Sequence, residues 1–146
     1  MKSKFIPLFL LSIFALGCKV TFVPNYDAAI EQEIVSAAKA NDKLYLNILA
    51  ADPDKRAYSN YVQAYADVES EINSIQLNEK ARKKNTDMVA IVALIQKHFT
   101  EYQNEHKNAK KVLNDAEIKA YEDDMKALWE PLLLAERGLP HTVPAN

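Results

Sequence analysis

The stretch YSNYVQAYADVESEINSI, residues 58–75, decides the fold. Residues three and four apart share one face of an α-helix, and most of the residues between the apolar ones here are polar or small. A narrow apolar seam of this kind is typical of helices that pack side by side in a bundle or coiled coil. The stretch therefore predicts an amphipathic helix in an all-α protein. Its seam residues, at alternating spacings of three and four, are Tyr58, Tyr61, Tyr65, Val68, Ile72 and Ile75.

The same pattern continues on both sides of this stretch. Residues 26–50 predict a first helix, with Asn41 as a polar member of an apolar seam, and residues 88–111 and 114–137 predict a third and a fourth. Pro131 is expected to kink the fourth helix or to end its regular part, because proline lacks the N–H donor and clashes with the preceding turn. The apolar seam residues are Ile30, Ile34, Ala37, Leu44 and Ile48 in the first helix; Met88, Ile91, Val92, Ile95, Phe99 and Tyr102 in the third; and Ile118, Tyr121, Met125, Leu128 and Leu132 in the fourth.

Short breaks separate the four segments. Asp52 and Pro53 are expected to start the second helix as N-cap and first helical residue, and Asn114 and Glu117 have the spacing of a capping box. Gly138 is placed to stop the last helix. Short connections favour neighbours that run in opposite directions, so the expected architecture is an antiparallel up-down four-helix bundle over residues 26–138. A three-helix bundle with the first helix partly detached is the alternative.

Residues 1–17 have the layout of a secretory signal peptide. Lys2 and Lys4 give a positive start, and residues 5–16 (FIPLFLLSIFAL) follow without a charge. This apolar run is shorter than the roughly 20 residues that a bilayer-spanning helix needs. The sequence Ala15-Leu16-Gly17-Cys18 resembles the signal of bacterial lipoproteins, in which a small residue precedes a cysteine that is acylated and becomes the mature N-terminus.

The resemblance implies attachment to a membrane through Cys18. Acyl chains such as palmitate anchor a protein without a protein span, and several chains on one residue hold it more stably than one. Residues 18–25 then form the lipidated N-terminus and a short linker, and residues 139–146 form a C-terminal tail. Lys19 follows the cysteine, where many inner-membrane lipoproteins have Asp, so the outer membrane facing the periplasm is favoured where the cell has one.

Composition narrows the function classes further. The chain has 146 residues, 18 Lys+Arg against 20 Asp+Glu and a formal net charge of -2, which suits one domain and offers no basic surface for nucleic acid. The single cysteine excludes an intramolecular disulfide and any metal cage that needs two thiolates. With two glycines, the chain is poorly supplied for hairpin-rich sheets and for Gly-rich phosphate loops.

Two groups of side chains are candidates for sites of chemistry. His98, Glu101 and Glu105 would lie along one helix face and could offer metal ligands, but no Glu-x-x-His or His-Glu-x-x-His pattern occurs, and a solvated surface is the favoured interpretation. Asp123 and Asp124, with the preceding Glu122, point about 100° apart in a helix and do not converge on one substrate atom. They are expected to form a solvated acidic face. No catalytic residue and no cofactor are predicted.

The tyrosines and the single tryptophan admit two interpretations. Tyr58, Tyr61 and Tyr65 share one stripe, either as core residues whose hydroxyls reach the bundle edge or as an aromatic groove for a partner helix or an apolar ligand. Trp129 precedes Pro131 in a region with apolar side chains around most of the helix, so it is either buried or part of a contact patch.

The basic run Lys80, Arg82, Lys83 and Lys84 lies at the predicted end of the second helix. It complements the negative end of the helix dipole and lacks the aromatic residues that nucleic-acid grooves carry. In an up-down bundle this end lies near the anchor, so contact with anionic lipid head groups is a further hypothesis.

Val23-Pro24-Asn25-Tyr26-Asp27, opening a long amphipathic helix shortly after Cys18, resembles the start of a group of small bacterial lipoproteins. The likeness covers about residues 18–49, implies a helical lipoprotein of the cell envelope and carries over no catalytic residue. The sequence thus predicts a non-enzymatic scaffold, accessory subunit or inhibitor that acts on an envelope protein partner through its helical surfaces. A bundle that binds a small apolar ligand or cofactor in its tyrosine-rich interior is the alternative.

Overall fold

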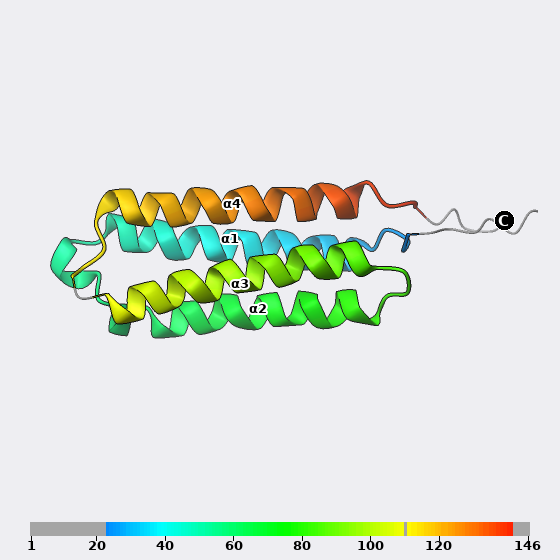
Figure 1. The fold of residues 1–146 in the computed structure, drawn as a ribbon. Coiled ribbons are helices and arrows are strands. Elements are labelled where there is room, and N and C mark those ends of the chain that lie inside the picture. The colour runs from blue at the N-terminus through cyan, green and yellow to red at the C-terminus, as the bar shows by residue number, and fades with distance from the viewer. Residues whose placement is uncertain (1–22, 110, 142–146) are drawn as a thin grey trace, which may run out of the picture.

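The computed structural model describes residues 23–109 and 111–141. Within these residues the chain forms four long helices, α1 (Ala28–Ala50), α2 (Val62–Ala81), α3 (Thr86–Asn108) and α4 (Asp115–Arg137). Two short 3-10 turns, η1 (Pro53–Lys55) and η2 (Tyr58–Asn60), lie between α1 and α2. Figure 1 shows the helices side by side along one long axis.

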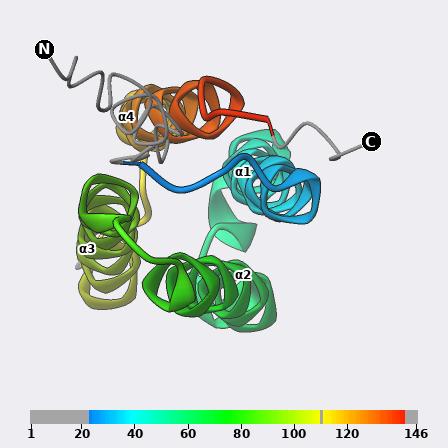
Figure 2. The same ribbon diagram turned by 90° about the vertical axis from the view of Figure 1, so that its right-hand side faces the viewer.

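The four helices occupy the corners of a square, as the end-on view in Figure 2 shows. Each packs against two neighbours: α1 and α3 both contact α2 and α4. Ion pairs fix the register of α1 on α4, because Asp42 pairs with Lys126 and Glu31 pairs with Arg137. The prediction of an all-α four-helix bundle is confirmed. The three-helix alternative is wrong, because α1 packs along two neighbours and is not detached.

The apolar seams form one continuous core. Most seam residues predicted for the first and third helices are buried, and the largest fully buried aromatic side chains are Tyr45, Tyr65 and Phe99. In α4 the buried line is offset from the predicted seam, because Tyr121 and Leu128 are only half-buried. The buried residues of α4 are Ile118, Glu122, Met125, Trp129, Leu132 and Glu136.

The start of the second helix differs from the prediction. Pro53 opens η1 rather than α2, and Asp52 pairs with Lys55 at 2.8 Å without capping the turn through its side chain. Tyr58 belongs to η2, and Tyr61 precedes the first residue of α2. The two turns let the chain cross from α1 to α2 while both tyrosine rings still pack against the core.

Helix ends follow the sequence more closely elsewhere. The capping box is present, since the Asn114 side chain accepts from the Glu117 N–H at 3.0 Å and the Glu117 carboxylate accepts from the Asn114 N–H at 2.9 Å. Gly138 is the C-cap of α4. The expectation that Pro131 ends the regular part of the fourth helix is wrong, because α4 continues to Arg137.

Among the residues that the structure describes, none of the helices combines the length and apolar character that crossing a bilayer requires.

Candidate functional site

An extended segment at residues 23–27, named the strap below, crosses the end of the bundle before α1 begins (Figure 2). The Tyr26 N–H donates to the Pro140 carbonyl at 3.0 Å, so the two ends of the described chain are joined here. The Asp27 N–H donates to the Glu136 carboxylate at 2.8 Å. The backbone N–H groups of two consecutive strap residues therefore hold the strap against α4 and against Pro140, which follows that helix.

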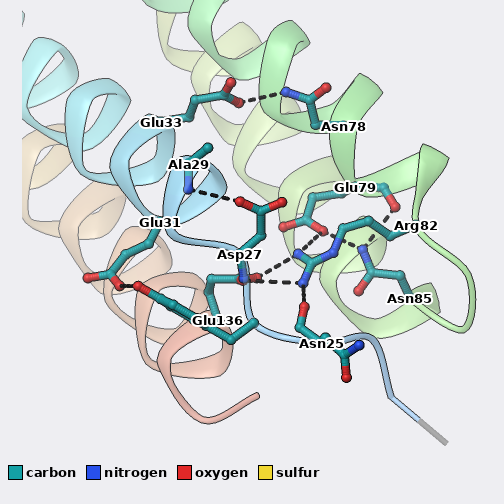
Figure 3. Close-up of polar contacts among 11 residues, drawn as sticks. Asn25, Asp27, Ala29, Glu31, Glu33, Asn78, Glu79, Arg82, Asn85 and Glu136 are labelled. Carbon is teal, nitrogen blue, oxygen red and sulfur yellow. Dashed lines mark hydrogen bonds and ion pairs between the residues drawn. The ribbon is translucent and has the colours of Figure 1, made fainter. Parts of the chain in front are cut away.

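Beneath the strap lies a buried ion-pair group, the Arg82 cluster, made of Glu79, Arg82, Asn85 and Glu136 (Figure 3). Arg82 Nη1 lies 2.7 Å from Glu136 Oε2 and 3.0 Å from Glu79 Oε2. Asn85 Nδ2 donates to the Glu79 carbonyl at 2.9 Å and also to the Glu79 carboxylate. The cluster ties the end of α2, the start of α3 and the end of α4 together.

The cluster also reaches the strap directly, because Arg82 Nη2 donates to the Asn25 carbonyl. One guanidinium thus serves two carboxylates and a backbone carbonyl from three parts of the chain. Figure 3 shows the Arg82 side chain lying between these acceptors. The path of the strap over the bundle end depends on where this arginine is held.

The charges in the Arg82 cluster do not balance. The side chains of Glu79 and Glu136 are both 0% exposed, and Arg82 is the cation that contacts them. Burial raises the pKa of the Glu79 carboxyl above its ordinary value, although hydrogen bonds from Asn85 and Arg82 oppose this. Glu79 Oε1 is buried without a hydrogen-bond partner. The site therefore favours a proton on Glu79 more than an exposed glutamate would.

A hollow of about 370 Å³ opens at the surface between the strap and the α2–α3 turn. It is called the strap hollow below. Lys84 closes the turn with a φ of 60°, in the left-handed region. The strap hollow is lined by Val23, Pro24, Asn25, Arg82, Lys83 and Lys84.

At the opposite end of the bundle, His106 links α3 to two other segments. Its Nε2 lies 2.7 Å from the Arg56 carbonyl, which can only accept, so Nε2 carries the proton and Nδ1 accepts from the Tyr65 hydroxyl at 3.0 Å. The rings of Tyr58 and Tyr61 pack against the imidazole. Burial lowers the pKa of His106, so the neutral ring is favoured.

Acidification should destabilise the protein through His106. Because the pKa of His106 is lower in the folded chain than its ordinary 6.5, the unfolded chain takes up the proton first as the pH falls. The stabilisation that neutral His106 gives the folded protein is complete above the unfolded-state pKa of about 6.5. It is lost as the pH falls through the folded-state pKa. Urea unfolding across this range measures it. In His106→Gln, whose amide can keep both hydrogen bonds, this part of the pH dependence should vanish; an unchanged slope contradicts the assignment.

The predicted tyrosine stripe lies at this end and is largely part of the core. Tyr65 is 0% exposed and packs against Phe99, with 5.7 Å between ring centroids. Tyr58 and Tyr61 are half-buried, and the Tyr61 hydroxyl reaches the Asn47 carbonyl at 3.5 Å. The rings point inward while two of the hydroxyls stay near the bundle edge.

Three side chains in the described part of the core, those of Asn41, Tyr45 and Trp129, have no hydrogen-bond partner for any of their polar atoms. Asn41, the polar seam residue of α1, is buried with both amide atoms unpaired. Tyr45, one helical turn later, is buried with its hydroxyl unpaired, and burial raises the pKa of that hydroxyl. The bundle interior therefore contains buried polar atoms that make no hydrogen bond.

Trp129 is 4% exposed, so its indole packs in the core rather than on an open contact patch. One side of the ring borders an outer hollow of about 340 Å³ between α1 and α4. Leu133 and Ala38 line the same hollow, and Lys39, Asp42, Lys126 and Glu130 complete its lining.

The basic run divides into two kinds of residue. Arg82 is drawn into the buried cluster, with a side chain 13% exposed. Lys80, Lys83 and Lys84 are exposed. Lys80 contacts Gln76 on its own helix at 3.2 Å, while Lys83 and Lys84 line the strap hollow.

The three residues weighed as metal ligands turn to separate partners. His98 Nδ1 lies 3.0 Å from a carboxylate oxygen of α4. Glu101 pairs with Lys97 at 3.8 Å, and Glu105 accepts from the Tyr121 hydroxyl at 2.6 Å. Across residues 23–109 and 111–141, no group of three His, Cys, Asp or Glu side chains is arranged to hold a metal ion.

The expected solvated acidic face on the fourth helix is wrong for two of its three members. Glu122 is 1% exposed and pairs with Lys119 and Lys126 of its own helix. Asp124 turns toward α3, where it accepts from the Tyr102 hydroxyl. Only Asp123 is fully exposed. Consecutive helical residues differ by about 100° in direction, so these neighbours do not share one face.

Sequence reasoning missed Glu79, Glu136 and His106 as buried residues, although a signal was present. Each continues its seam at a spacing of three or four, since Glu79 follows Ile75, and Glu136 follows Leu132. A polar residue on an apolar seam is a buried polar residue unless the seam has ended. Cys18 and the rest of the predicted signal segment lie outside the described residues.

The chain matches no protein-family model, no curated protein and no solved structure.

Proposed function

We propose that this protein is a lipid-anchored, non-catalytic interaction module of the bacterial cell envelope, acting as a scaffold or accessory subunit. Residues 1–17, which resemble a secretory signal peptide, would direct the chain to the envelope, and the acylated Cys18 would anchor it to the membrane. An outer-membrane position facing the periplasm is favoured where the cell has that membrane.

The observation that carries this proposal is the strap. A tether of four residues, 19–22, joins Cys18 to Val23, and the strap then binds the bundle end through the Arg82 cluster and Pro140. A long flexible linker would leave the distance and orientation of the bundle relative to the membrane variable. A bound strap instead gives the bundle a defined attachment point. This arrangement suits a module that presents a fixed surface to a partner.

The length of the bundle sets what the partner meets. Helices of 23 residues extend about 35 Å at 1.5 Å per residue, so the His106 end lies about that far beyond the strap. The sides of the helices carry exposed apolar residues, with Leu77 at 70% and Leu134 at 58% near the strap end and Leu94 at 42% further along α3. These sides, rather than a catalytic cleft, are the surfaces through which the module would act.

Replacing Cys18 by alanine should abolish membrane attachment. The acyl chains are the proposed anchor, so the wild-type protein should enter the detergent phase of a detergent–water separation and Cys18→Ala should remain in the aqueous phase. The mass of the wild-type protein should also include the acyl groups. Ser12→Ala, a small change within the apolar run of the signal, is the matched control and should behave as the wild type.

Equal partitioning of wild type and Cys18→Ala would remove the anchor from the proposal. If the anchor is present, crosslinking of the membrane-attached wild-type protein should recover one stoichiometric envelope protein. The purified protein should be colourless. A bound chromophore would instead support the alternative of a ligand-binding bundle.

A further inference from the structure

The strap hollow lies close to the point at which the chain would enter a membrane. Four residues separate Cys18 from Val23, and the five Cα-to-Cα steps between them span at most about 18 Å when the chain is fully extended. Val23 is itself part of the hollow's lining. If Cys18 carries the anchor, the hollow must therefore lie within about two nanometres of the acylated residue.

The lining of the hollow combines two chemistries. Val23, which is 44% exposed, and Pro24 present apolar surface on the strap side. Lys83 and Lys84 present ammonium groups on exposed side chains from the α2–α3 turn. Apolar surface beside cations matches the head-group region of a phospholipid, where a phosphate lies next to the glycerol and the first acyl carbons.

Among the described residues that line the hollow, Lys83 and Lys84 are the exposed cations. Arg82 is engaged by Glu79 and Glu136 below the surface, so those three charges face one another. The Asp27 carboxylate is turned toward α1, where it accepts from a helix N–H. Asp87, in the first turn of α3, is exposed and reduces the local positive potential without cancelling it.

We propose that the strap hollow holds the phosphate head group of an anionic phospholipid in the membrane to which Cys18 is anchored, with Lys83 and Lys84 as its cationic contacts. This inference rests on the proposed lipid anchor and adds an orientation to it. The bundle stands with the strap end on the membrane and the His106 end pointing away.

The test uses the acylated full-length protein in lipid nanodiscs. One set contains phosphatidylethanolamine with one third phosphatidylglycerol, and the other contains phosphatidylcholine alone. Backbone hydrogen exchange at residues 82–86 should be slower in the anionic discs, by up to about twenty-five-fold, because each of two lysines near an anionic surface contributes a factor of about five. Lys83→Gln with Lys84→Gln should remove the difference between the two discs.

The matched control is Lys107→Gln with Lys111→Gln, which removes the same charge near the opposite end of α3 and should leave the difference unchanged. Equal exchange in both discs, or an unaffected Lys83/Lys84 variant, overturns the inference while leaving the anchor intact. Equal protection by inorganic phosphate in the neutral discs overturns it in favour of a soluble anion site. Protein that fails to enter either disc lacks the anchor, and both proposals then fall.

Discussion

Replacing Arg82 by methionine should lower the free energy of unfolding by about 3–5 kcal/mol, because the change leaves two buried carboxylates without their counter-charge. Glu79 and Glu136 are both fully buried, and Arg82 contacts each of them. Urea unfolding at neutral pH, followed by circular dichroism, measures the loss. Hydrogen exchange should also accelerate at the strap, since the Asn25 carbonyl loses its donor.

The comparison variants separate charge from size. Lys83→Met alters an exposed neighbour and should change stability by less than about 0.5 kcal/mol. Adding Glu79→Gln and Glu136→Gln to Arg82→Met should recover much of the lost stability, since the buried charges are then gone. A triple variant no more stable than Arg82→Met would mean that packing, rather than charge, explains the loss.

Arg56→Met should lower the free energy of unfolding by about 2–4 kcal/mol, because it leaves two half-buried carbonyls without a charged donor. Arg56 is 6% exposed, and its Nε and Nη2 each donate at 2.8 Å to the carbonyls of Ala51 and Leu49 at the end of α1. The backbone carbonyl of Arg56 also accepts from His106. Loss of the guanidinium therefore loosens the turn that positions the histidine. Denaturant unfolding measures the effect.

Asp115 supplies the control for this variant. Its carboxylate pairs with Arg56 Nη1 at 2.5 Å, but the Asp115 side chain is 77% exposed, and an exposed partner of this kind contributes at most about 1 kcal/mol. Asp115→Asn should therefore be nearly neutral, and Arg56→Lys should lie between wild type and Arg56→Met. If Asp115→Asn proves as damaging as Arg56→Met, the ion pair outweighs the carbonyl bonds.

The fold could be predicted from the sequence because helix packing depends on apolar spacing. The apolar seam of the first helix, for example Ile34 and Ile48, is buried as its period requires. The start of the second helix could not be placed, because Pro53 permits either a long helix or a short turn. In the structure the chain forms two 3-10 turns between α1 and α2, and Tyr58 and Tyr61 pack against the core.

The Arg82 cluster could not be predicted from the sequence for a different reason. The seam spacing indicates that Glu79 and Glu136 are buried, and Arg82 is only three residues from Glu79, but no spacing indicates that the same arginine also pairs with Glu136 in the folded chain. That arginine was predicted as part of an exposed basic run, and its neighbours Lys83 and Lys84 are indeed exposed. Charge pairing across 54 residues leaves no local pattern to read.

The strap also determines how the molecule would respond to tension. A pull applied to the chain ahead of Val23 loads the contacts of Asn25, Tyr26 and Asp27 before it reaches the first residue of α1, because these three residues lie between Val23 and that helix. The contacts pass part of the load to Arg82, Glu136 and Pro140. A pull on one end of the described chain is therefore shared with its other end and with the C-terminal ends of α2 and α4.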